Sequence, residues 1–302
     1  MTAKVILNPY SNRWNSQKRW PEAESALKAA GVDFHLAVSG KKGQIVEMAE
    51  QAVLQKFSPL IIVGGDGSIG DAANGLMRAA RSMNGPMPPL AILPTGSAND
   101  LVYALALPTD LNEAAQVIAA GKTKAMDLGR LNDRYFVNNS AAGLEPYVTL
   151  KHEKIHWIKG MARYLVAAVQ AILDKPEWLG TVKWDSPSGE YNGKLSLISV
   201  GNGRRTGGFF MTPHADPFDG KLTLAFGYRG TRLGLFQALP RAFSEDKGSY
   251  VEMEGMQELH AMHVSIHLDQ PSPAHTDGEL LPTWIQDFEY KILPQCLTII
   301  VK

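Results

Sequence analysis

The sequence contains a single cysteine, no excess of either charge and no long hydrophobic run. Cys296 has no partner for an internal disulfide, so we expect a reducing compartment. The 30 Lys and Arg residues balance the 30 Asp and Glu residues, so no chain-wide positive field attracts nucleic acid. Apolar runs such as 60–63 and 165–169 are much shorter than the roughly 18 residues of a transmembrane helix. We expect a cytoplasmic protein with no transmembrane segment and no nucleic-acid partner, which meets a membrane only peripherally, at the inner membrane surface.

The composition also excludes several non-globular classes. Hydrophobic residues make up 45% of the chain and charged residues 20%, which is ordinary for a globular protein and argues against disorder, collagen or a coiled coil. At roughly 150 residues per domain, the chain is long enough for two domains that each bury a core.

Short apolar runs alternate with helical spacing over residues 1–127. The runs 60–63 and 90–93 contain no polar residue, which is typical of strands buried on both faces of a sheet. Alternation of strand and helix predicts an α/β domain with a parallel sheet and helices on both faces. The helices are expected at 20–30, 44–55, 71–83 and 99–107.

Residues 128–302 show a different pattern, in which short strands are separated by turn dipeptides such as Asp219-Gly220. This pattern predicts an antiparallel β-sandwich domain over 128–302, and the composition changes near 125–132. One long helix is expected over 151–174. The strands are expected at 127–141, 180–184, 194–201, 221–227, 260–268, 283–293 and 297–301.

The strongest local motif is Gly64-Gly65-Asp66-Gly67-Ser68, directly after the run 60–63. Glycine lets the backbone approach a ligand closely, and the start of the following helix offers N–H groups and a positive dipole end, which suits phosphate. A carboxylate would repel phosphate, so Asp66 is sensible there if it holds Mg²⁺ or orients a hydroxyl group. A tight turn in which Asp66 caps the helix is the weaker alternative.

A second loop of the same kind follows the run 90–93 and reads Pro94-Thr95-Gly96-Ser97-Ala98-Asn99-Asp100. Gly96 again permits close backbone approach, and Ser97 and Asn99 supply neutral polar groups. Open α/β sheets bind ligands at the carboxyl ends of adjacent strands, so we expect the two loops to flank one crevice.

The third candidate is Asp277-Gly278-Glu279 in the second half of the chain. Two carboxylates around a glycine suit a base and its partner in activating a hydroxyl group. Asp-Gly is also a strong signal of a two-residue hairpin. From this segment alone, an ordinary hairpin turn with exposed acids is the favoured interpretation.

Taken together, these motifs resemble the diacylglycerol kinase-like lipid kinases, a family that includes bacterial diacylglycerol and phosphatidylglycerol kinases and the sphingosine and ceramide kinases. The resemblance spans nearly the whole chain and also includes Gly207-Gly208 ahead of residues 213–220. It implies a nucleotide-binding α/β domain, a β-sandwich domain for the lipid, an active site in the cleft between them, and a place in phospholipid biosynthesis.

The resemblance further implies transfer of the γ-phosphoryl group of ATP to a lipid hydroxyl such as that of diacylglycerol. Asp277 would be the base that takes the hydroxyl proton, Glu279 would support Asp277 or the metal, and Asp66 would act beside the phosphates. The residues that would hold ATP are Asn8, Gly64, Gly65, Gly67, Ser68, Gly96, Ser97 and Asn99.

A magnesium ion is implied at a separate position. Some bacterial members of the family hold a structural Mg²⁺ at the place that corresponds to 216–222 of this chain. Asp216 and Asp219 would supply carboxylates there, and Leu222 would supply a carbonyl oxygen. An ordinary Asp-Gly turn is an equal alternative for this segment.

Two other functions stay open. NAD kinase shares the Gly-Gly-Asp-Gly element, so a soluble small-molecule kinase is one alternative. The family usually has Asn-Glu where this chain has Gly70-Asp71, so a catalytically inactive regulator that binds lipid or nucleotide is another. The acceptor lipid also stays open, as does the oligomeric state, with a homodimer among the options.

Two further patterns have a functional and a plain interpretation. The expected helix 151–174 has an apolar stripe beside a basic face and Trp157, which suits a membrane surface. Packing on the protein's own core explains the stripe and is favoured. His263 and His267 share a strand face, but no further zinc ligand is evident, so an exposed strand face is favoured there.

Overall fold

The computed structural model describes residues 2–83, 85–158 and 161–302. The chain forms two compact units: unit 1 comprises Met1–Leu128 and Pro294–Lys302, and unit 2 comprises Gly129–Leu293. The boundary expected between 127 and 128 lies one residue before the point at which the chain first passes from unit 1 into unit 2. The sequence pattern did not indicate that the last nine residues return to unit 1. They do so because their backbone joins the sheet of that unit.

Unit 1 is built on a parallel sheet whose strands lie in the order β2-β1-β3-β4. The end of β16 continues this sheet beside β4, where Ile299 pairs with Leu90. Every residue of β3 and β4 is buried, as the two apolar runs predict. The strands are β1 (Ala3–Leu7), β2 (Phe34–Val38), β3 (Leu60–Gly64), β4 (Leu90–Pro94) and β16 (Ile285–Ile300).

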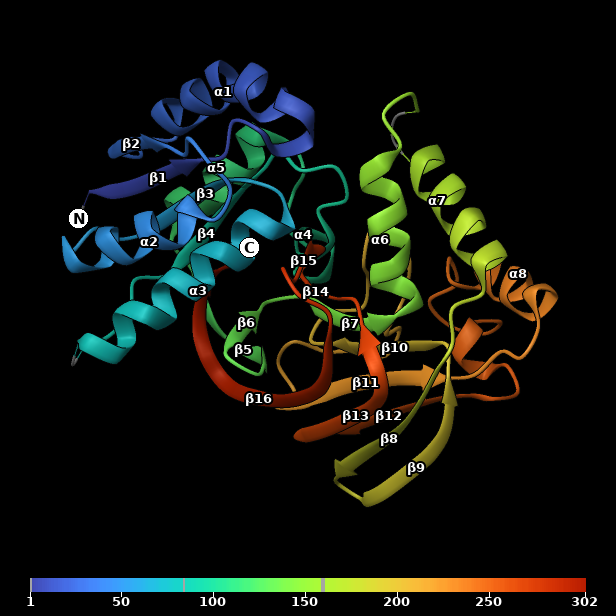
Figure 1. The fold of residues 1–302 in the computed structure, drawn as a ribbon. Helices are drawn as coiled ribbons and strands as arrows, with labels where there is room; N and C mark the ends of the chain where they lie inside the picture. Colours follow the sequence, from blue (N-terminus) through green and yellow to red (C-terminus); the bar gives the residue numbers. More distant parts are fainter. Residues whose placement is uncertain (1, 84, 159–160) are drawn as a thin grey trace. The chain divides into compact units, whose positions relative to one another are not determined.

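Helices cover both faces of this sheet, which confirms the predicted α/β domain (Figure 1). On one face, Leu27 and Ile118 pack against Val5 and Val63. On the other face, two helices pack against each other. The helices are α1 (Ser11–Ala29) and α5 (Leu111–Ala120) on the first face, α2 (Gln44–Leu54) and α3 (Asp66–Ser82) on the second, and the short α4 (Asp100–Ala104).

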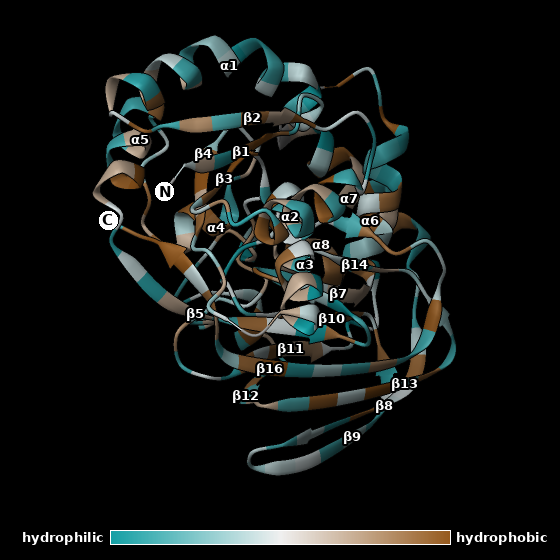
Figure 2. Ribbon diagram, turned by 90° about the vertical axis from the view of Figure 1, so that its left-hand side faces the viewer, coloured by the Kyte–Doolittle hydropathy of each residue, from teal (hydrophilic) through white to brown (hydrophobic). Residues whose placement is uncertain are grey.

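Hydropathy follows these layers in Figure 2. The central strands β1, β3 and β4 are largely brown, whereas α1 is mostly teal and white. Helix α1 buries only a narrow stripe that includes Ala23, Ala26 and Leu27. The core of unit 1 therefore comes from the strands and from the inner faces of the helices.

The two helices on the second face approach one another closely at Gly75. A Cβ atom there would lie 2.3 Å from the carbonyl oxygen of Val46 and 2.7 Å from the Cβ atom of Ala49. We expect Gly75→Ala to lower the free energy of unfolding by about 1–3 kcal/mol in urea denaturation, because stiff groups must move apart. Gly85→Ala is the control, since a Cβ atom at Gly85 meets nothing within 4 Å. Equal stability of the two variants would contradict this close packing.

Unit 2 contains two antiparallel sheets that share one core, which confirms the predicted β-sandwich. One sheet has the order β12-β11-β10-β7-β14-β15, and the other includes β16, β13, β8 and β9. Val200 and Phe226 of the first sheet lie in the same core cluster as Val264 and Phe288 of the second. The remaining strands are β5 (Thr123–Leu131), β6 (Arg134–Phe136), β7 (Asn139–Gly143), β8 (Trp178–Asp185), β9 (Ser188–Leu195), β10 (Leu197–Gly201), β11 (Leu222–Gly227), β12 (Met256–Ala261), β13 (His263–Ser272), β14 (Ala274–Thr276) and β15 (Glu279–Leu280).

The prediction of one long helix over 151–174 is wrong. The structure has α6 (Leu144–Lys154) and α7 (Met161–Asp174) instead, which lie side by side (Figure 1). Between them, Ile155 is buried and has an extended backbone with ψ of 109°. Ile155 therefore follows the apolar spacing of the expected helix, although it does not lie in a helix.

Arg163 explains how these two helices are held as a hairpin. Its Nε donates to the carbonyl oxygen of His152 at 2.7 Å, and a terminal nitrogen donates to that of Glu153 at 3.3 Å. A guanidinium group of α7 thus satisfies carbonyls at the end of α6 and complements the negative end of its dipole. Lys159 belongs to the basic face expected beside the apolar stripe of the helix 151–174, and it lies outside the described residues. Unit 2 also contains α8 (Arg232–Arg241) and the 3₁₀ turn Tyr250–Glu252.

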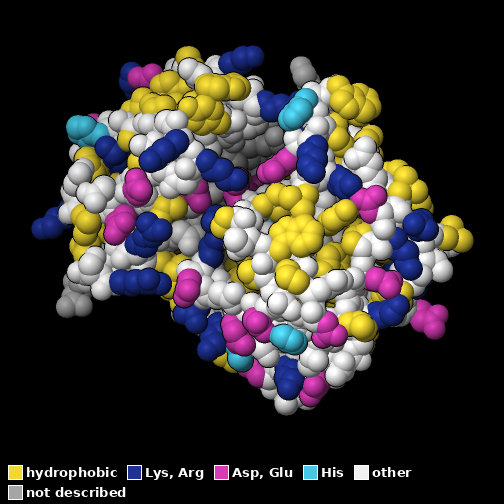
Figure 3. Space-filling model, in the orientation of Figure 1, with side chains coloured by type: hydrophobic (Ala, Val, Ile, Leu, Met, Phe, Trp, Pro, Cys, Tyr) yellow, Lys and Arg dark blue, Asp and Glu magenta, His cyan; other side chains and the backbone are white. Residues whose placement is uncertain are grey.

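The surface carries charges of both signs. Figure 3 shows acidic and basic side chains interspersed on the face it draws. Within the described ranges, no helix has the length and apolar character needed to cross a membrane.

Candidate active site

Polar loops meet at the carboxyl ends of β1, β3 and β4 in unit 1. The side-chain amide of Asn8, just after β1, donates to the Oγ of Ser68 at 2.8 Å. The Oγ of Ser97, after β4, donates to the Oδ1 of Asn12 at 2.8 Å. The loop after β1 therefore contacts both glycine-containing loops, and the structure brings together three of the residues predicted to hold ATP.

The two glycine-containing loops touch through their backbones. A Cβ atom at Gly96 would lie 2.5 Å from the Cα of Gly65 and 2.6 Å from the Oδ1 of Asn99. A side chain cannot stand between these loops without moving one of them. The first turn of α3 begins directly after Gly65, so its N–H groups and the positive end of its dipole lie beside this contact.

Asp66 connects the same two loops. Its carboxylate lies in the first turn of α3 and accepts a hydrogen bond from the backbone N–H of Leu101 at 2.9 Å. Leu101 belongs to α4, so Asp66 caps the helix after the second loop. This contact fixes the carboxylate beside the predicted phosphate site.

The backbone of these loops contains a run of left-handed residues. Asn12, Arg13 and Trp14 have φ values of 49°, 54° and 70°, and Asn99 has φ of 51°. This conformation costs about 1–2 kcal/mol each at Arg13 and Trp14, whereas asparagine adopts it more readily. Such strain is typical of segments whose shape serves a ligand. The Ser97 to Asn12 hydrogen bond helps to hold this shape.

Asp277 lies in a tight hairpin of unit 2. Thr276 pairs with Glu279, and Asp277 and Gly278 between them have φ of 50° and 78°. These angles match a two-residue hairpin turn of type I′. The local interpretation as a hairpin is therefore confirmed, but Asp277 is only 7% exposed, whereas an ordinary turn acid faces water.

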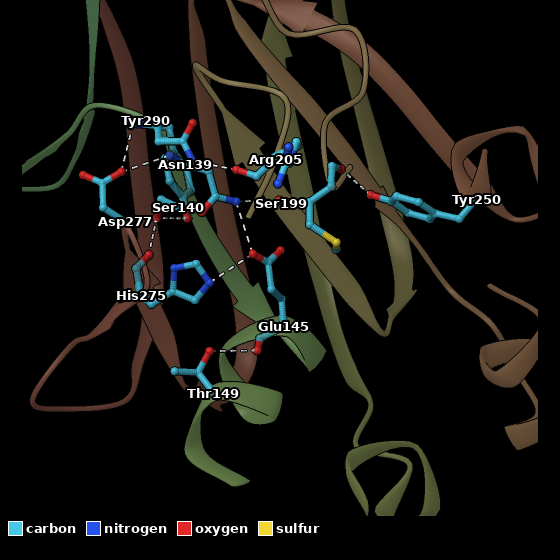
Figure 4. Close-up of polar contacts among 12 residues, drawn as sticks. Asn139, Ser140, Glu145, Thr149, Ser199, Arg205, Tyr250, His275, Asp277 and Tyr290 are labelled. Atoms are coloured by element: carbon cyan, nitrogen blue, oxygen red, sulfur yellow. Dashed lines mark hydrogen bonds and ion pairs between the residues drawn. The ribbon is translucent and has the colours of Figure 1, made fainter. Parts of the chain in front are cut away.

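Three backbone N–H groups bind the carboxylate of Asp277, and Figure 4 draws the hydrogen bonds to one of its two oxygens. Oδ1 accepts from Asn138 at 2.8 Å and from Asn139 at 3.1 Å, and Oδ2 accepts from Val137 at 3.0 Å. The N–H of Asp277 donates in turn to the carbonyl oxygen of Asn139 at 2.7 Å. These donors favour an ionised carboxylate and fix its orientation, because charge-assisted bonds of this kind are strong and directional.

A buried tyrosine of the other sheet, Tyr290 on β16, lies beside Ser140 on β7. The hydroxyl groups of Tyr290 and Ser140 are 3.3 Å apart, and Ser140 donates to the carbonyl oxygen of His275 at 2.7 Å. Burial raises the pKa of Tyr290 well above its ordinary value, so its phenol stays neutral at physiological pH. The strands around Asp277 are thus joined by neutral hydrogen bonds as well as by the sheet itself.

Unit 2 contains a buried polar cluster that none of the sequence motifs indicated. The Nε2 of His275 and the Oε1 of Glu145 are 3.1 Å apart, and the side-chain amide of Asn139 donates to the same oxygen at 3.2 Å. His275 is fully buried. The signal in the sequence was weak: a histidine two residues before Asp277, and an acid soon after Gly143.

The segment predicted to bind structural Mg²⁺ has local turn contacts. Asp216 accepts from the N–H of Phe218 at 3.0 Å, and Asp219 accepts from the N–H of Lys221 at 2.9 Å. Both hydrogen bonds lie at an exposed turn, whereas Leu222 is buried at the start of β11. The turn that the sequence offered as an alternative is therefore present, and two carboxylates lie within it.

Surface contacts account for the histidines of β13. His263 pairs with Glu289 at 2.6 Å and His267 pairs with Asp287 at 2.7 Å, all on an exposed strand face. Throughout the part of the chain that the structure describes, no three His, Cys, Asp or Glu side chains gather as metal ligands would. The two histidines therefore lie on an exposed strand face, as predicted.

Two family models match this chain. Residues 2–131 match the family model described as "Diacylglycerol kinase catalytic domain". Residues 138–301 match the model described as "YegS C-terminal NAD kinase beta sandwich-like domain". The chain belongs to the diacylglycerol kinase family of lipid kinases. The description of the second model names a likeness to NAD kinase for the β-sandwich.

Individual relatives of the diacylglycerol kinase family agree with this assignment. A diacylglycerol kinase of Staphylococcus carnosus strain TM300 is 25% identical over 92% of this chain and 88% of its own length. One from Staphylococcus epidermidis strain RP62A is 30% identical over 74% of this chain and 69% of its own length. The crystal structure of a diacylglycerol kinase from Bacillus anthracis strain Sterne has the same fold, with a TM-score of 0.74 at 20% identity, over 100% of this chain and 97% of that one.

Proposed function

We propose that this lipid kinase transfers the γ-phosphoryl group of ATP to the hydroxyl group of a diacylglycerol-like lipid, with Asp277 as the base. The hydroxyl proton passes to the Asp277 carboxylate while the hydroxyl oxygen bonds to the γ-phosphorus. The bond from that phosphorus to the β-phosphate oxygen breaks, and ADP leaves. Two curated relatives are named diacylglycerol kinases, which supports this acceptor class.

The observation that carries the proposal is the immobilised carboxylate of Asp277. Phosphoryl transfer depends on positioning and charge stabilisation more than on covalent chemistry, and a base must be held in place to act. Three backbone donors hold the carboxylate of Asp277, which is only 7% exposed. An exposed turn acid without a role would need none of these donors.

In unit 1, the backbones around Gly65 and Gly96 and the start of α3 suit the phosphates of ATP. Asn8, Ser68, Ser97 and Asn99 supply polar groups beside them. Gly64 and Gly67 flank the same turn, so the proposed nucleotide site includes all the residues predicted for it.

Oxygen ligands of the kind that Mg²⁺ prefers are present in both units. Asp66 would hold Mg²⁺ beside the phosphates, and Glu279 would support Asp277 or the metal. Asp216 and Asp219 would supply carboxylates, and Leu222 a carbonyl oxygen, to a structural ion. Bound Mg²⁺ supplies charge neutralisation for the transferred group.

A lipid acceptor also requires contact with a membrane surface. The helical layer of unit 2 exposes Trp157 between α6 and α7 to 79%, and Leu233 on α8 to 68%. Exposed apolar side chains of this kind suit peripheral binding. We therefore propose peripheral attachment at the inner surface of the cytoplasmic membrane through this layer.

A panel of acceptors tests the proposed function. Purified protein receives labelled ATP and Mg²⁺ with mixed micelles of diacylglycerol, phosphatidylglycerol, sphingosine or ceramide, and separately with NAD. We expect label in diacylglycerol. Label only in NAD, or ATP binding with no labelled product, would contradict the proposal and would favour a soluble kinase or an inactive regulator respectively.

A further inference from the structure

The Asp277 base is connected to a second buried acid through Asn139. The backbone N–H of Asn139 donates to Asp277, and its side-chain amide donates to Glu145 at 3.2 Å and to the Oγ of Ser199 at 3.1 Å. Both hydrogens of that side-chain amide are thus used. One residue, at the start of β7, therefore contacts the proposed base through its backbone and the buried acid through its side chain (Figure 4).

His275 completes this chain of hydrogen bonds. Its Nε2 is 3.1 Å from the Oε1 of Glu145, and its Nδ1 is buried without a partner. Because a carboxylate oxygen can only accept, the hydrogen bond between the two side chains requires a hydrogen on Nε2, which His275 donates to Glu145.

The three residues come from different elements. His275 lies on β14, Asn139 begins β7, and Glu145 lies in the first turn of α6, where the helix dipole favours a negative charge. Glu145 has a side chain that is only 10% exposed. A buried carboxylate that accepts two hydrogen bonds on one oxygen fixes the direction of both donors.

We propose that His275 and Glu145 are positioning residues, which hold Asn139 and the adjoining peptide groups so that their N–H groups stay directed at the Asp277 carboxylate. This inference rests on the proposed role of Asp277 as the base. Neither residue touches the reacting groups in this account. They act through Asn139 on the orientation of Asp277.

The test compares His275→Leu with His275→Gln in the full-length chain. Leucine fills similar space but removes the histidine donor and leaves Glu145 with only the Asn139 amide, whereas the glutamine amide places an N–H near the position of Nε2. We expect His275→Leu to lower kcat by about 10- to 100-fold, because small misplacements of a catalytic group have effects of this size. KM for ATP and for the lipid should stay nearly constant, and His275→Gln should restore most of the turnover.

Amide hydrogen exchange gives a readout that does not depend on activity. In His275→Leu, exchange at Val137, Asn138 and Asn139 should become faster than in the unchanged protein, and in His275→Gln it should stay slow. His267→Leu is the matched control, because it removes a histidine–carboxylate pair whose histidine side chain is 59% exposed. It should change neither kcat nor the exchange of these three amides.

Each outcome decides the inference. An unchanged kcat in His275→Leu, or slow exchange at all three amides, would overturn it. If His275→Leu does not fold, Glu145→Gln replaces it: this variant keeps the shape and the acceptor oxygen but loses the charge, and it should lower kcat without changing KM. If the unchanged protein phosphorylates no lipid, the proposed function fails, and the exchange data alone decide whether the pair positions residues 137–139.

Discussion

Asp277→Asn is expected to abolish lipid phosphorylation while ATP still binds with nearly unchanged affinity. The carboxamide cannot take a proton from the lipid hydroxyl, and loss of a general base lowers turnover by about 10²- to 10⁴-fold. ATP binding should persist because the proposed nucleotide residues belong to unit 1 and Asp277 belongs to unit 2. Phosphate transfer from labelled ATP and equilibrium titration with ATP measure the two properties separately.

The same substitution has a predictable effect on stability. The asparagine oxygen can accept two of the three N–H groups that bind Asp277, but its amide hydrogens then face the third donor. An unsatisfied buried donor costs about 1–3 kcal/mol, so the assays belong well below the melting temperature. Asp277→Ser offers a second variant that keeps an acceptor oxygen and has no base.

A control separates this effect from a general loss of negative charge in unit 2. Asp287 has an 80% exposed side chain that pairs with His267, and Asp287→Asn should leave turnover unchanged. Undiminished turnover in folded Asp277→Asn or Asp277→Ser would remove Asp277 from the role of base. Loss of ATP binding in those variants would contradict the separation of roles between the units.

The parallel sheet of unit 1 was predictable from the sequence because its strands are short and apolar on both faces. Residues 60–63 and 90–93 became β3 and β4, which are buried throughout. Helix α5 was missed, although Asp110 is a clear N-cap whose carboxylate accepts from the N–H groups of Asn112 and Glu113. Local signals were therefore sufficient for β3 and β4, and one was also present for α5.

Local signals failed where distant parts of the chain decide the structure. Strands expected at 283–293 and 297–301 form the single β16, although Pro294 interrupts the pattern. Gln295 has φ of 53°, and its N–H is satisfied by the fully buried carboxylate of Asp127 at 2.8 Å. Asp127 is far away in sequence, so nothing near Pro294 indicates that the strand continues.

The candidate site also has parts that local sequence predicted and parts that distant residues decide. The two glycine loops were predictable because glycine at the end of a buried strand is typical of a backbone that comes close to a ligand. The burial of Asp277 was not predictable, because its three donors lie about 140 residues earlier in the chain. The resemblance to lipid kinases indicated a role for Asp277, but only the structure shows Asn139, Glu145 and His275 connected to it.

Gly96→Ala is expected to weaken ATP binding by about 10- to 100-fold, and turnover should fall at least as much, because backbone groups that bind phosphate act only in the correct position. The new Cβ atom would lie 2.5 Å from the Cα of Gly65 and 2.6 Å from the Oδ1 of Asn99. Both distances are too short for carbon and oxygen atoms in contact, so the two loops must separate. Titration with ATP measures the loss directly.

Gly85→Ala is the matched control for this prediction, since the same methyl group there meets nothing within 4 Å and the residue lies in unit 1 as well. It should bind ATP as the unchanged protein does. Slow amide exchange along β3 and β4 in Gly96→Ala would show that unit 1 is still folded, so that a loss of affinity belongs to the loops. Native ATP affinity in a folded Gly96→Ala protein would place the nucleotide elsewhere, because these loops cannot keep their present contact with a methyl group between them.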